Sequence, residues 1–237
     1  MYEKRFCAHR GLSALMPENT LPAFAAAYAL GADEIEFDIR LTKDGRLIVS
    51  HDDSLERISD GTGCLRDFTL KELKELNAGA KKGWVVPFCT AEEVFQQLAG
   101  KLVFNIHLKE HGEDGYLIRE IVKLAEKYQA CDSIYFAGSP GELEWMQRIA
   151  PAIPRTAIQL PRDTVGIFDM ARTYGCSGVQ FWLDMFDEPL IQKMHDNGIR
   201  CNLYYADTLE NYDRYLAMGI DTLLTNRMDL AAHYRRR

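Results

Sequence analysis

Two carboxylates stand two residues apart in segment 34–39, which reads Glu-Ile-Glu-Phe-Asp-Ile. Successive side chains of a β-strand point to opposite faces, so Glu36 and Asp38 would share one face about 7 Å apart, with apolar residues on the other. Neighbouring buried carboxylates repel each other, and a divalent cation is the usual way to neutralise them. A solvated strand edge is the alternative, so this pattern alone leaves metal binding open.

Segment 102–109 alternates in the same way, with Val103, Asn105, His107 and Lys109 on one face. That face becomes more polar toward the C-terminal end of the segment. Buried polar groups need partners, so such a row would be costly in a purely packing role. An exposed strand end is the alternative reading, and the segment alone does not decide between them.

Two histidines close predicted strands. His9 is followed by Arg10, and His51 is followed by Asp52. Histidine can give and take protons near neutral pH. A lone histidine at a strand end is usually structural, but two of them beside a carboxylate pair favour acid–base chemistry. With Arg10 and Lys109 available for an anion, the set suits in-line displacement at phosphorus assisted by a cation.

Short β-rich runs alternate with amphipathic stretches along the chain. We expect strands at residues 5–9, 34–41, 46–51, 102–108, 133–137, 156–160, 178–182, 200–205 and 222–225. We expect helices at residues 20–30, 91–99, 116–128, 141–149, 164–174, 189–197 and 209–218. Such repetition implies a parallel sheet with right-handed crossovers. Eight units in 237 residues favour an α/β fold of the TIM (β/α)8 barrel type, as a single domain over 1–237, above an open doubly wound sheet.

Residues 52–87 interrupt this rhythm with turn residues and a short helix. Thr69 with Glu72, and again Thr90 with Glu93, have the spacing of a capping box at a helix start. We expect a small insertion over the C-terminal face of the barrel. Functional groups of TIM barrels collect at that face.

Composition excludes several classes of protein. The net charge of −7 argues against a broad nucleic-acid surface, and the terminal Arg235–Arg237 run is expected to be a solvated tail. No apolar run is long enough to predict stable membrane insertion. Met1–Arg10 lacks the apolar centre of a secretory signal, so a cytoplasmic location is expected. The six cysteines form no Cys-x-x-Cys pair and are expected to be reduced and mostly buried.

Short polar motifs follow one another in a fixed order: His9-Arg10-Gly11, Pro17-Glu18-Asn19-Thr20, Glu36-x-Asp38, Thr42-Lys43-Asp44-Gly45 and His51-Asp52. Later matches include Arg57 and Gly61-Thr62-Gly63 in the insertion, and segments 105–109, 202–204 and 219–226. In order and spacing this set resembles the signature of the glycerophosphodiester phosphodiesterase family. The resemblance covers nearly the whole chain and is densest over the first 52 residues.

The resemblance implies a TIM barrel that hydrolyses glycerophosphodiesters to an alcohol and glycerol 3-phosphate. It implies an acid–base pair, His9 and His51, and one divalent cation, Mg²⁺, Ca²⁺ or Mn²⁺, on Glu36 and Asp38. It also implies that Arg10 and Lys109 contact the phosphate. In related proteins a hydroxyl of the substrate attacks phosphorus first and gives a cyclic phosphate, which can then be hydrolysed.

One departure from the family pattern concerns the metal. His107 stands where the family has a third acidic ligand. A neutral imidazole can still ligate, but it removes one negative charge. We therefore expect weaker binding of Mg²⁺ and Ca²⁺ and a shift toward transition metals such as Mn²⁺ or Zn²⁺.

Other departures concern the substrate. Tyr204 stands where the family often has Trp, and Asn226 and Met228 replace a common Asp and Pro. Gln180 and Trp182 share a strand face and are candidate substrate contacts together with Tyr204; core packing is the alternative for Trp182. The expected partner is a small-molecule phosphodiester, and the sequence is compatible with a homo-oligomer. The competing hypothesis is a catalytically weak phosphate-binding barrel whose metal affinity was lost through His107.

Overall fold

Parallel strands close into a barrel in the computed structural model, which describes residues 3–160 and 166–236. In order around the barrel they are β1 (Arg5–His9), β2 (Glu34–Leu41), β4 (Val103–Leu108), β5 (Ile134–Gly138), β6 (Arg155–Ile158), β7 (Gly178–Trp182), β8 (Arg200–Tyr204) and β9 (Thr222–Thr225). Strand β9 pairs in parallel with β1, which closes the ring. The predicted TIM barrel is confirmed.

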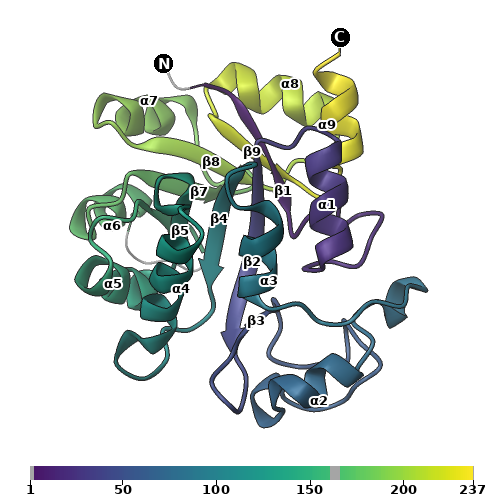
Figure 1. The fold of residues 1–237 in the computed structure, drawn as a ribbon. Coiled ribbons are helices and arrows are strands. Elements are labelled where there is room, and N and C mark those ends of the chain that lie inside the picture. Colours follow the sequence, from purple (N-terminus) through teal and green to yellow (C-terminus); the bar gives the residue numbers. More distant parts are fainter. Residues whose placement is uncertain (1–2, 161–165, 237) are drawn as a thin grey trace.

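Helices surround this barrel (Figure 1). They are α1 (Leu21–Ala29), α3 (Ala91–Leu98), α4 (Tyr116–Lys127), α5 (Pro140–Ile149), α6 (Ile167–Thr173), α7 (Glu188–Asp196), α8 (Leu209–Met218) and α9 (Met228–Tyr234). The start of the helix expected at 164–174 lies outside the described residues, and α9 was not expected. None of the described helices is long and apolar enough to cross a membrane.

The strand expected at 46–51 is shorter and has a different role. It forms β3 (Leu47–Val49), which pairs antiparallel with β2 instead of joining the barrel. Only residues 42–46 separate the two strands. A connection this short allows a hairpin, whereas a parallel neighbour needs a crossover of a dozen residues or more.

The insertion at 52–87 folds over its own small core beside the barrel. That core comprises Ile48, Leu55, Leu65, Leu73, Ala78 and Phe88. Its helix α2 (Leu70–Glu75) starts at the predicted capping box of Thr69, and the second predicted box, at Thr90, starts α3. In Figure 1 the insertion lies beyond the end toward which the β2 arrow points. It therefore lies at the C-terminal end of the strands, as expected.

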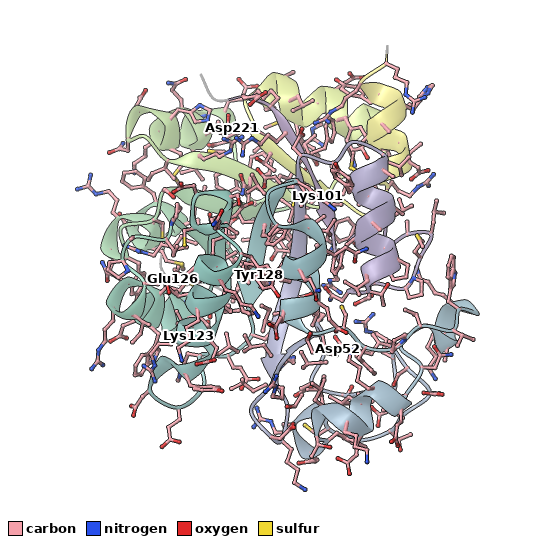
Figure 2. The ribbon with its side chains drawn as sticks, viewed as in Figure 1. Asp52, Lys101, Lys123, Glu126, Tyr128 and Asp221 are labelled. Carbon is pink, nitrogen blue, oxygen red and sulfur yellow. The ribbon has the colours of Figure 1, made fainter. Side chains whose placement is uncertain are left out.

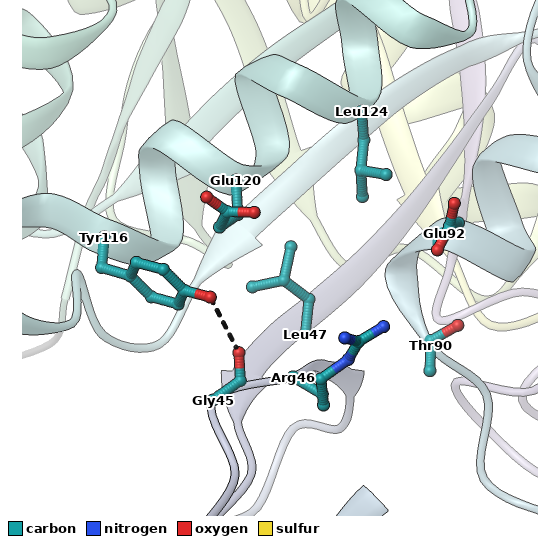
Figure 3. Close-up of a pocket in the computed structure, with 8 residues that line it drawn as sticks. All are labelled: Gly45, Arg46, Leu47, Thr90, Glu92, Tyr116, Glu120 and Leu124. Carbon is teal, nitrogen blue, oxygen red and sulfur yellow. Dashed lines mark hydrogen bonds between the residues drawn. The ribbon is translucent and has the colours of Figure 1, made fainter.

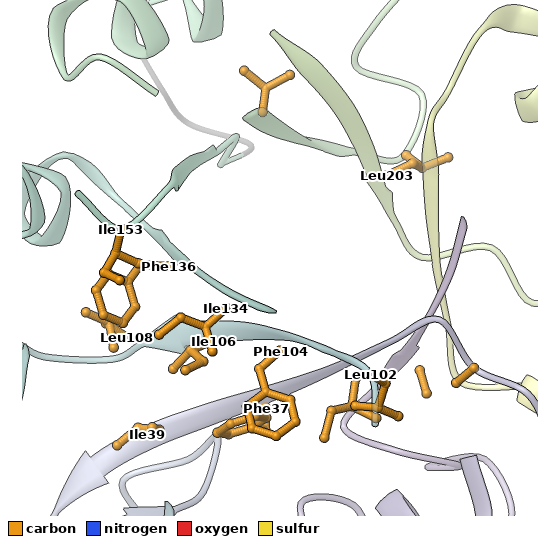
Figure 4. Close-up of a cluster of buried hydrophobic side chains, with 14 of the residues drawn as sticks. Phe37, Ile39, Leu102, Phe104, Ile106, Leu108, Ile134, Phe136, Ile153 and Leu203 are labelled. Atoms are coloured by element: carbon orange, nitrogen blue, oxygen red, sulfur yellow. The ribbon is translucent and has the colours of Figure 1, made fainter. Parts of the chain in front are cut away.

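The main core is formed by buried side chains of the barrel strands and of the helices outside them. Figure 4 shows part of this core, including Phe37 and Phe104. Phe37 of β2 packs edge-on against Phe104 of β4, with ring centroids 5.5 Å apart, and Phe104 packs in turn against Phe95 of α3 at 5.0 Å. All three rings are buried. Successive residues of a strand point to opposite sides of the sheet. Since the apolar residues of β2 and β4 point outward and pack against the helices, the polar residues between them point toward the barrel interior.

The cysteines behave as predicted. All six are free thiols, four of them buried: Cys7, Cys89, Cys176 and Cys201. Burial raises the pKa of the Cys89 thiol to about 12 and that of Cys176 to about 11. Thiols of this kind are unreactive packing groups near neutral pH.

Candidate active site

The register of the barrel brings the predicted carboxylates and imidazoles into adjoining positions. His9 of β1 lies opposite Glu36 of β2, and Asp38 lies opposite His107 of β4. Glu36 is 1% exposed and Asp38 is fully buried. Side chains from three separate parts of the sequence therefore meet near the C-terminal end of the barrel.

Glu36, Asp38 and His107 form a candidate metal site. One ligand atom from each lies within 4.8 Å of the others. His107 Nδ1 lies 3.2 Å from Asp38 Oδ1 and 3.7 Å from Glu36 Oε1. Asp38 Oδ1 is buried, and Lys109 Nζ at 3.0 Å and His107 Nδ1 are the nitrogen atoms beside it. Two buried carboxylates and an imidazole that converge in this way fit a divalent cation.

Asp38 also lies among fixed positive charges. Lys109 Nζ lies 3.0 Å from Asp38 Oδ1 and 3.1 Å from His107 Nδ1, and Arg10 Nε lies 3.4 Å from Asp38 Oδ2. Burial would raise the pKa of Asp38, but Lys109, His107 and Arg10 outweigh it and hold the pKa well below its ordinary value. Asp38 is thus a carboxylate throughout the neutral range and can bind a cation.

A tight turn after β1 places Arg10 over this cluster. Arg10 and Gly11 both have positive φ, 56° and 80°. A Cβ atom on Gly11 would lie 2.7 Å from the carbonyl carbon of Ala23, so only glycine fits there. The Arg10 amide donates to Glu36 Oε2 at 3.1 Å, which fixes the turn against the ligand carboxylate.

Asn19 holds Asp38 from the opposite side of the same loop. Its side-chain amide donates to Asp38 Oδ2 at 2.9 Å, and its backbone amide donates to the Arg10 carbonyl at 3.1 Å. Asn19 is 5% exposed. The sequence motif contained Asn19 but gave it no role; this geometry makes it a positioning residue for Asp38.

His9 is oriented by a chain of hydrogen bonds that the sequence did not reveal. Asn226 Nδ2 donates to Asp207 Oδ2 at 2.7 Å, and because a carboxylate only accepts, this fixes which end of the amide faces His9. Asn226 Oδ1 then faces His9 Nδ1 at 2.8 Å, which assigns the proton to Nδ1. In the neutral ring the lone pair is then on the other nitrogen, Nε2, which lies 3.9 Å from Glu36 Oε2. Tyr205 stacks on the imidazole, with centroids 5.6 Å apart.

His51 has a different partner. Its Nδ1 lies 2.6 Å from Asp52 Oδ1, and its backbone carbonyl accepts two hydrogen bonds from Arg40 at 2.8 and 3.0 Å. Burial lowers the pKa of His51, although Asp38 and Asp52 oppose that shift. Figure 2 labels its sequence neighbour Asp52 where the barrel meets the insertion.

A series of ion pairs connects Asp52, the partner of His51, to Arg10 beside the candidate metal site. Arg10 Nη1 pairs with Glu18 Oε1 at 2.9 Å, Glu18 accepts two bonds from Arg57 at 2.8 Å, and Arg57 pairs with Asp52. Burial raises the pKa of Asp52, but hydrogen bonds from Arg57 and His51 outweigh it and lower the pKa to about 2. Glu18 and Arg57 matched motifs without an assigned role, and here they tie the insertion to the barrel mouth.

The three predicted substrate contacts lie in different settings. Gln180 is 3% exposed and accepts from Asn105 Nδ2 at 3.0 Å inside the barrel. Trp182 is 39% exposed, so it is not a core side chain, and its ring meets Tyr204 edge-on at 4.9 Å. The Tyr204 hydroxyl donates to the Gln159 carbonyl at 3.2 Å. Trp182 and Tyr204 are thus available at the ends of β7 and β8, whereas Gln180 supports the interior.

A separate cavity of about 130 Å³ lies between the β2–β3 hairpin and helices α3 and α4 (Figure 3). Tyr116 donates across it to the Gly45 carbonyl at 3.3 Å, and Arg46, Glu92 and Glu120 also line it. None of the predicted site residues lines this cavity. The candidate site is therefore defined by converging charged groups and not by this hollow.

Residues 9–230 match the profile of the Glycerophosphoryl diester phosphodiesterase family. The chain belongs to this family. A glycerophosphodiester phosphodiesterase of Caldanaerobacter subterraneus subsp. tengcongensis is 32% identical over 232 residues, which cover 92% of each chain. Another, of Bacillus altitudinis, is 40% identical over 238 residues, which cover 96% of each chain.

A solved structure shares this fold. A phosphodiesterase of Oleispira antarctica, in complex with the product sn-glycerol-3-phosphate, superposes with a TM-score of 0.91 at 23% identity, covering 99% of this chain and 98% of that one. At that identity the likeness shows the fold. Membership of the family confirms the enzyme class expected from the sequence, a phosphoric diester hydrolase.

Proposed function

We propose that the chain hydrolyses glycerophosphodiesters to an alcohol and glycerol 3-phosphate, with a divalent cation and two histidines. The observation that carries the proposal is the meeting of Glu36, Asp38 and His107 within 4.8 Å beside His9. Relatives named glycerophosphodiester phosphodiesterases, and the product bound to the Oleispira enzyme, support the choice of substrate.

Glu36, Asp38 and His107 are the proposed ligands of the cation. A bound dication would take up charge that develops on the phosphoryl oxygens during displacement. His107 offers nitrogen where an acid would offer oxygen, so the set favours Mn²⁺, Co²⁺ or Zn²⁺ more than an all-carboxylate set would. The cofactor is therefore proposed to be one divalent cation with a preference shifted toward transition metals.

The two histidines have complementary surroundings for proton transfer. His9 donates from Nδ1 to a neutral amide oxygen and keeps a lone pair on Nε2, which suits it to take a proton from the attacking hydroxyl. The Asp52 carboxylate on His51 Nδ1 orients the ring and opposes the lowering of the His51 pKa by burial, and the lowered pKa makes a protonated His51 a readier donor to the leaving oxygen. We therefore assign His9 as the general base and His51 as the general acid.

Arg10 and Lys109 are the proposed phosphate contacts. Both cations already lie beside Asp38, where the reacting phosphodiester anion must approach the metal ligands. Trp182 and Tyr204, at the ends of neighbouring strands, are the proposed contacts for the organic part of the substrate. An attacking hydroxyl of the glyceryl group would give a cyclic phosphate, which ³¹P NMR of the reaction mixture can detect.

Hydrolysis of glycerophosphocholine, with and without EDTA and with Mg²⁺, Ca²⁺, Mn²⁺ or Zn²⁺ restored in turn, tests the proposal. Replacing His9 or His51 by Ala should lower kcat roughly 10²–10⁴-fold. His233→Ala is the matched control, because His233 is exposed on α9 outside the candidate site, and it should leave kcat unchanged. Phosphate binding without turnover in any metal would favour the weak phosphate-binding barrel instead.

A further inference from the structure

The insertion carries an exposed apolar tip. Val85 is 95% exposed and Trp84 is 42% exposed, just after the 3-10 helix Ala80–Lys82. In Figure 1 this helix projects from the insertion at the edge of the molecule. An exposed tryptophan beside an almost fully exposed valine is a costly arrangement for a surface that meets only water.

The tip is held in place by hydrogen bonds. Asn77 Oδ1 accepts from the amides of Gly79 and Val86 at 2.9 and 3.0 Å, and Asn77 Nδ2 donates to the Trp84 carbonyl at 2.9 Å. Val86 is 8% exposed, so its side chain packs inward. The alternation of an extended segment then turns Val85 outward. The exposure of Val85 is therefore built into the fold.

Two lysines and a third apolar residue accompany the tip. Lys81 and Lys82 are exposed, and Lys82 Nζ donates to the carbonyls of Ser13 and Ala14. This contact brings the tip beside the β1–α1 loop, where the next residue is 54% exposed Leu15. We call the resulting surface the tip patch; its residues are Leu15, Lys81, Lys82, Trp84 and Val85.

The tip patch adjoins the candidate active site. A hollow of about 70 Å³ separates the tip from the β1–α1 loop, and Lys81 and Lys82 line it together with Glu18 and Arg57. Glu18 and Arg57 are the residues that connect Arg10 to Asp52. A partner that contacts the tip patch would therefore lie beside the entrance of the candidate active site.

We propose that the tip patch docks the protein on an anionic lipid surface. Tryptophan favours the boundary between water and hydrocarbon, and the neighbouring valine and leucine can enter the acyl region. Adjacent lysines complement anionic headgroups, whereas the chain as a whole, at −7, would be repelled by them. The two lysines thus place positive charge beside the apolar tip of an otherwise negative protein. This positive charge complements the negative charge of the headgroups, and for that reason we choose an anionic lipid surface as the partner. Docking would bring the mouth to membrane-derived phosphodiesters without any segment crossing the bilayer.

Sedimentation of the full chain with vesicles tests this docking. The protein should bind vesicles of phosphatidylcholine mixed with phosphatidylglycerol more tightly than vesicles of phosphatidylcholine alone. The double variant Trp84→Ser/Val85→Ser should weaken binding at least about tenfold. Lys81→Glu should weaken it by about fivefold or more. The matched controls Tyr28→Ser, on an exposed aromatic of α1, and Lys71→Glu, on an exposed lysine of α2, should bind as the parent does.

Binding and catalysis are read separately. Hydrolysis of soluble glycerophosphocholine by the double variant should equal that of the parent, and an unchanged circular dichroism spectrum shows independently that the variant is folded. Equal binding to neutral and anionic vesicles, equal loss in the control variants, or no binding by the parent chain would each overturn the docking proposal. A parent dimer that the double variant converts to a monomer in analytical ultracentrifugation would also overturn it, because the partner would be a second copy. None of these results depends on whether the chain hydrolyses its proposed substrate.

Discussion

Replacing Asn226 by Leu tests the orientation assigned to His9. Leucine has nearly the shape of asparagine but no hydrogen-bond acceptor. It therefore removes the bond that His9 Nδ1 donates to Asn226 Oδ1 at 2.8 Å. His9 is 9% exposed, so water is a poor substitute. The imidazole then has no reason to keep its proton on Nδ1, and the lone pair needed on Nε2 is lost in part of the molecules.

The size of the effect follows from the bond that is lost. Leaving a buried donor without an acceptor costs about 1–3 kcal/mol. About 1.4 kcal/mol corresponds to a tenfold change in rate, so kcat should fall roughly ten- to hundredfold. The proposed phosphate contacts Arg10 and Lys109 are untouched, so KM should change little. A loss confined to kcat is what a positioning residue for the base predicts.

Steady-state kinetics on glycerophosphocholine measure this split, and two further variants complete the test. Ser13→Ala removes the other donor to Asn226 Oδ1, at 2.9 Å, and should change kcat less than about threefold, because the bond to His9 remains. Asn226→Asp keeps an acceptor for His9 Nδ1 but loses the donor to Asp207 Oδ2 at 2.7 Å, so it should recover only part of the lost kcat. The reasoning fails if the Leu variant turns over like the parent or if its loss lies in KM.

Two more predictions concern the charges around the site. Arg57→Ala should raise the pKa of Asp52 from about 2 toward 3.8. A carboxyl group whose pKa is lower in the folded chain than in the unfolded chain stabilises the fold above the unfolded-state pKa, and this contribution is lost as the pH falls through the folded-state pKa. In urea unfolding, the stability advantage of the parent over the variant should therefore shrink between about pH 4 and pH 2. His107→Glu should shift the metal preference from Mn²⁺ or Zn²⁺ toward Mg²⁺ and Ca²⁺ in the EDTA-restoration assay; an unchanged order of metals would mean that His107 does not ligate.

The parts of the site that follow from local alternation could be predicted from the sequence. Glu36 and Asp38 share a face because a strand repeats every two residues, and buried Phe37 between them requires that face to be the inner one. The same argument placed His107 and Lys109. The parallel pairing of β2 and β4 then brings His107 opposite Asp38. The barrel topology predicts that these strands are neighbours, but the sequence alone does not predict which residues lie opposite each other.

The residues that orient these groups could not be predicted, because their partners are remote in sequence. Asn226 lies 217 positions from His9. Arg57 joins Glu18 across 39 positions, and no periodic pattern marks such a pair. The role of β3 was also missed, since a short apolar run reads the same whether it pairs antiparallel with its neighbour or enters the barrel.

The charge around Asp38 is the reason we expect one residue change at position 107 to alter metal choice without removing the proposed site. Glu36 and Asp38 contribute two negative charges, and Arg10 and Lys109 offset them with two positive ones within reach of Asp38. An acid at position 107 would add one negative charge and so favour a hard cation, which binds mainly through charge. With an imidazole there, binding depends more on the affinity of a metal for nitrogen, while the positive side chains stay available to the phosphodiester. We therefore expect metal preference and anion attraction to be coupled through His107 and Lys109, which lie 3.1 Å apart.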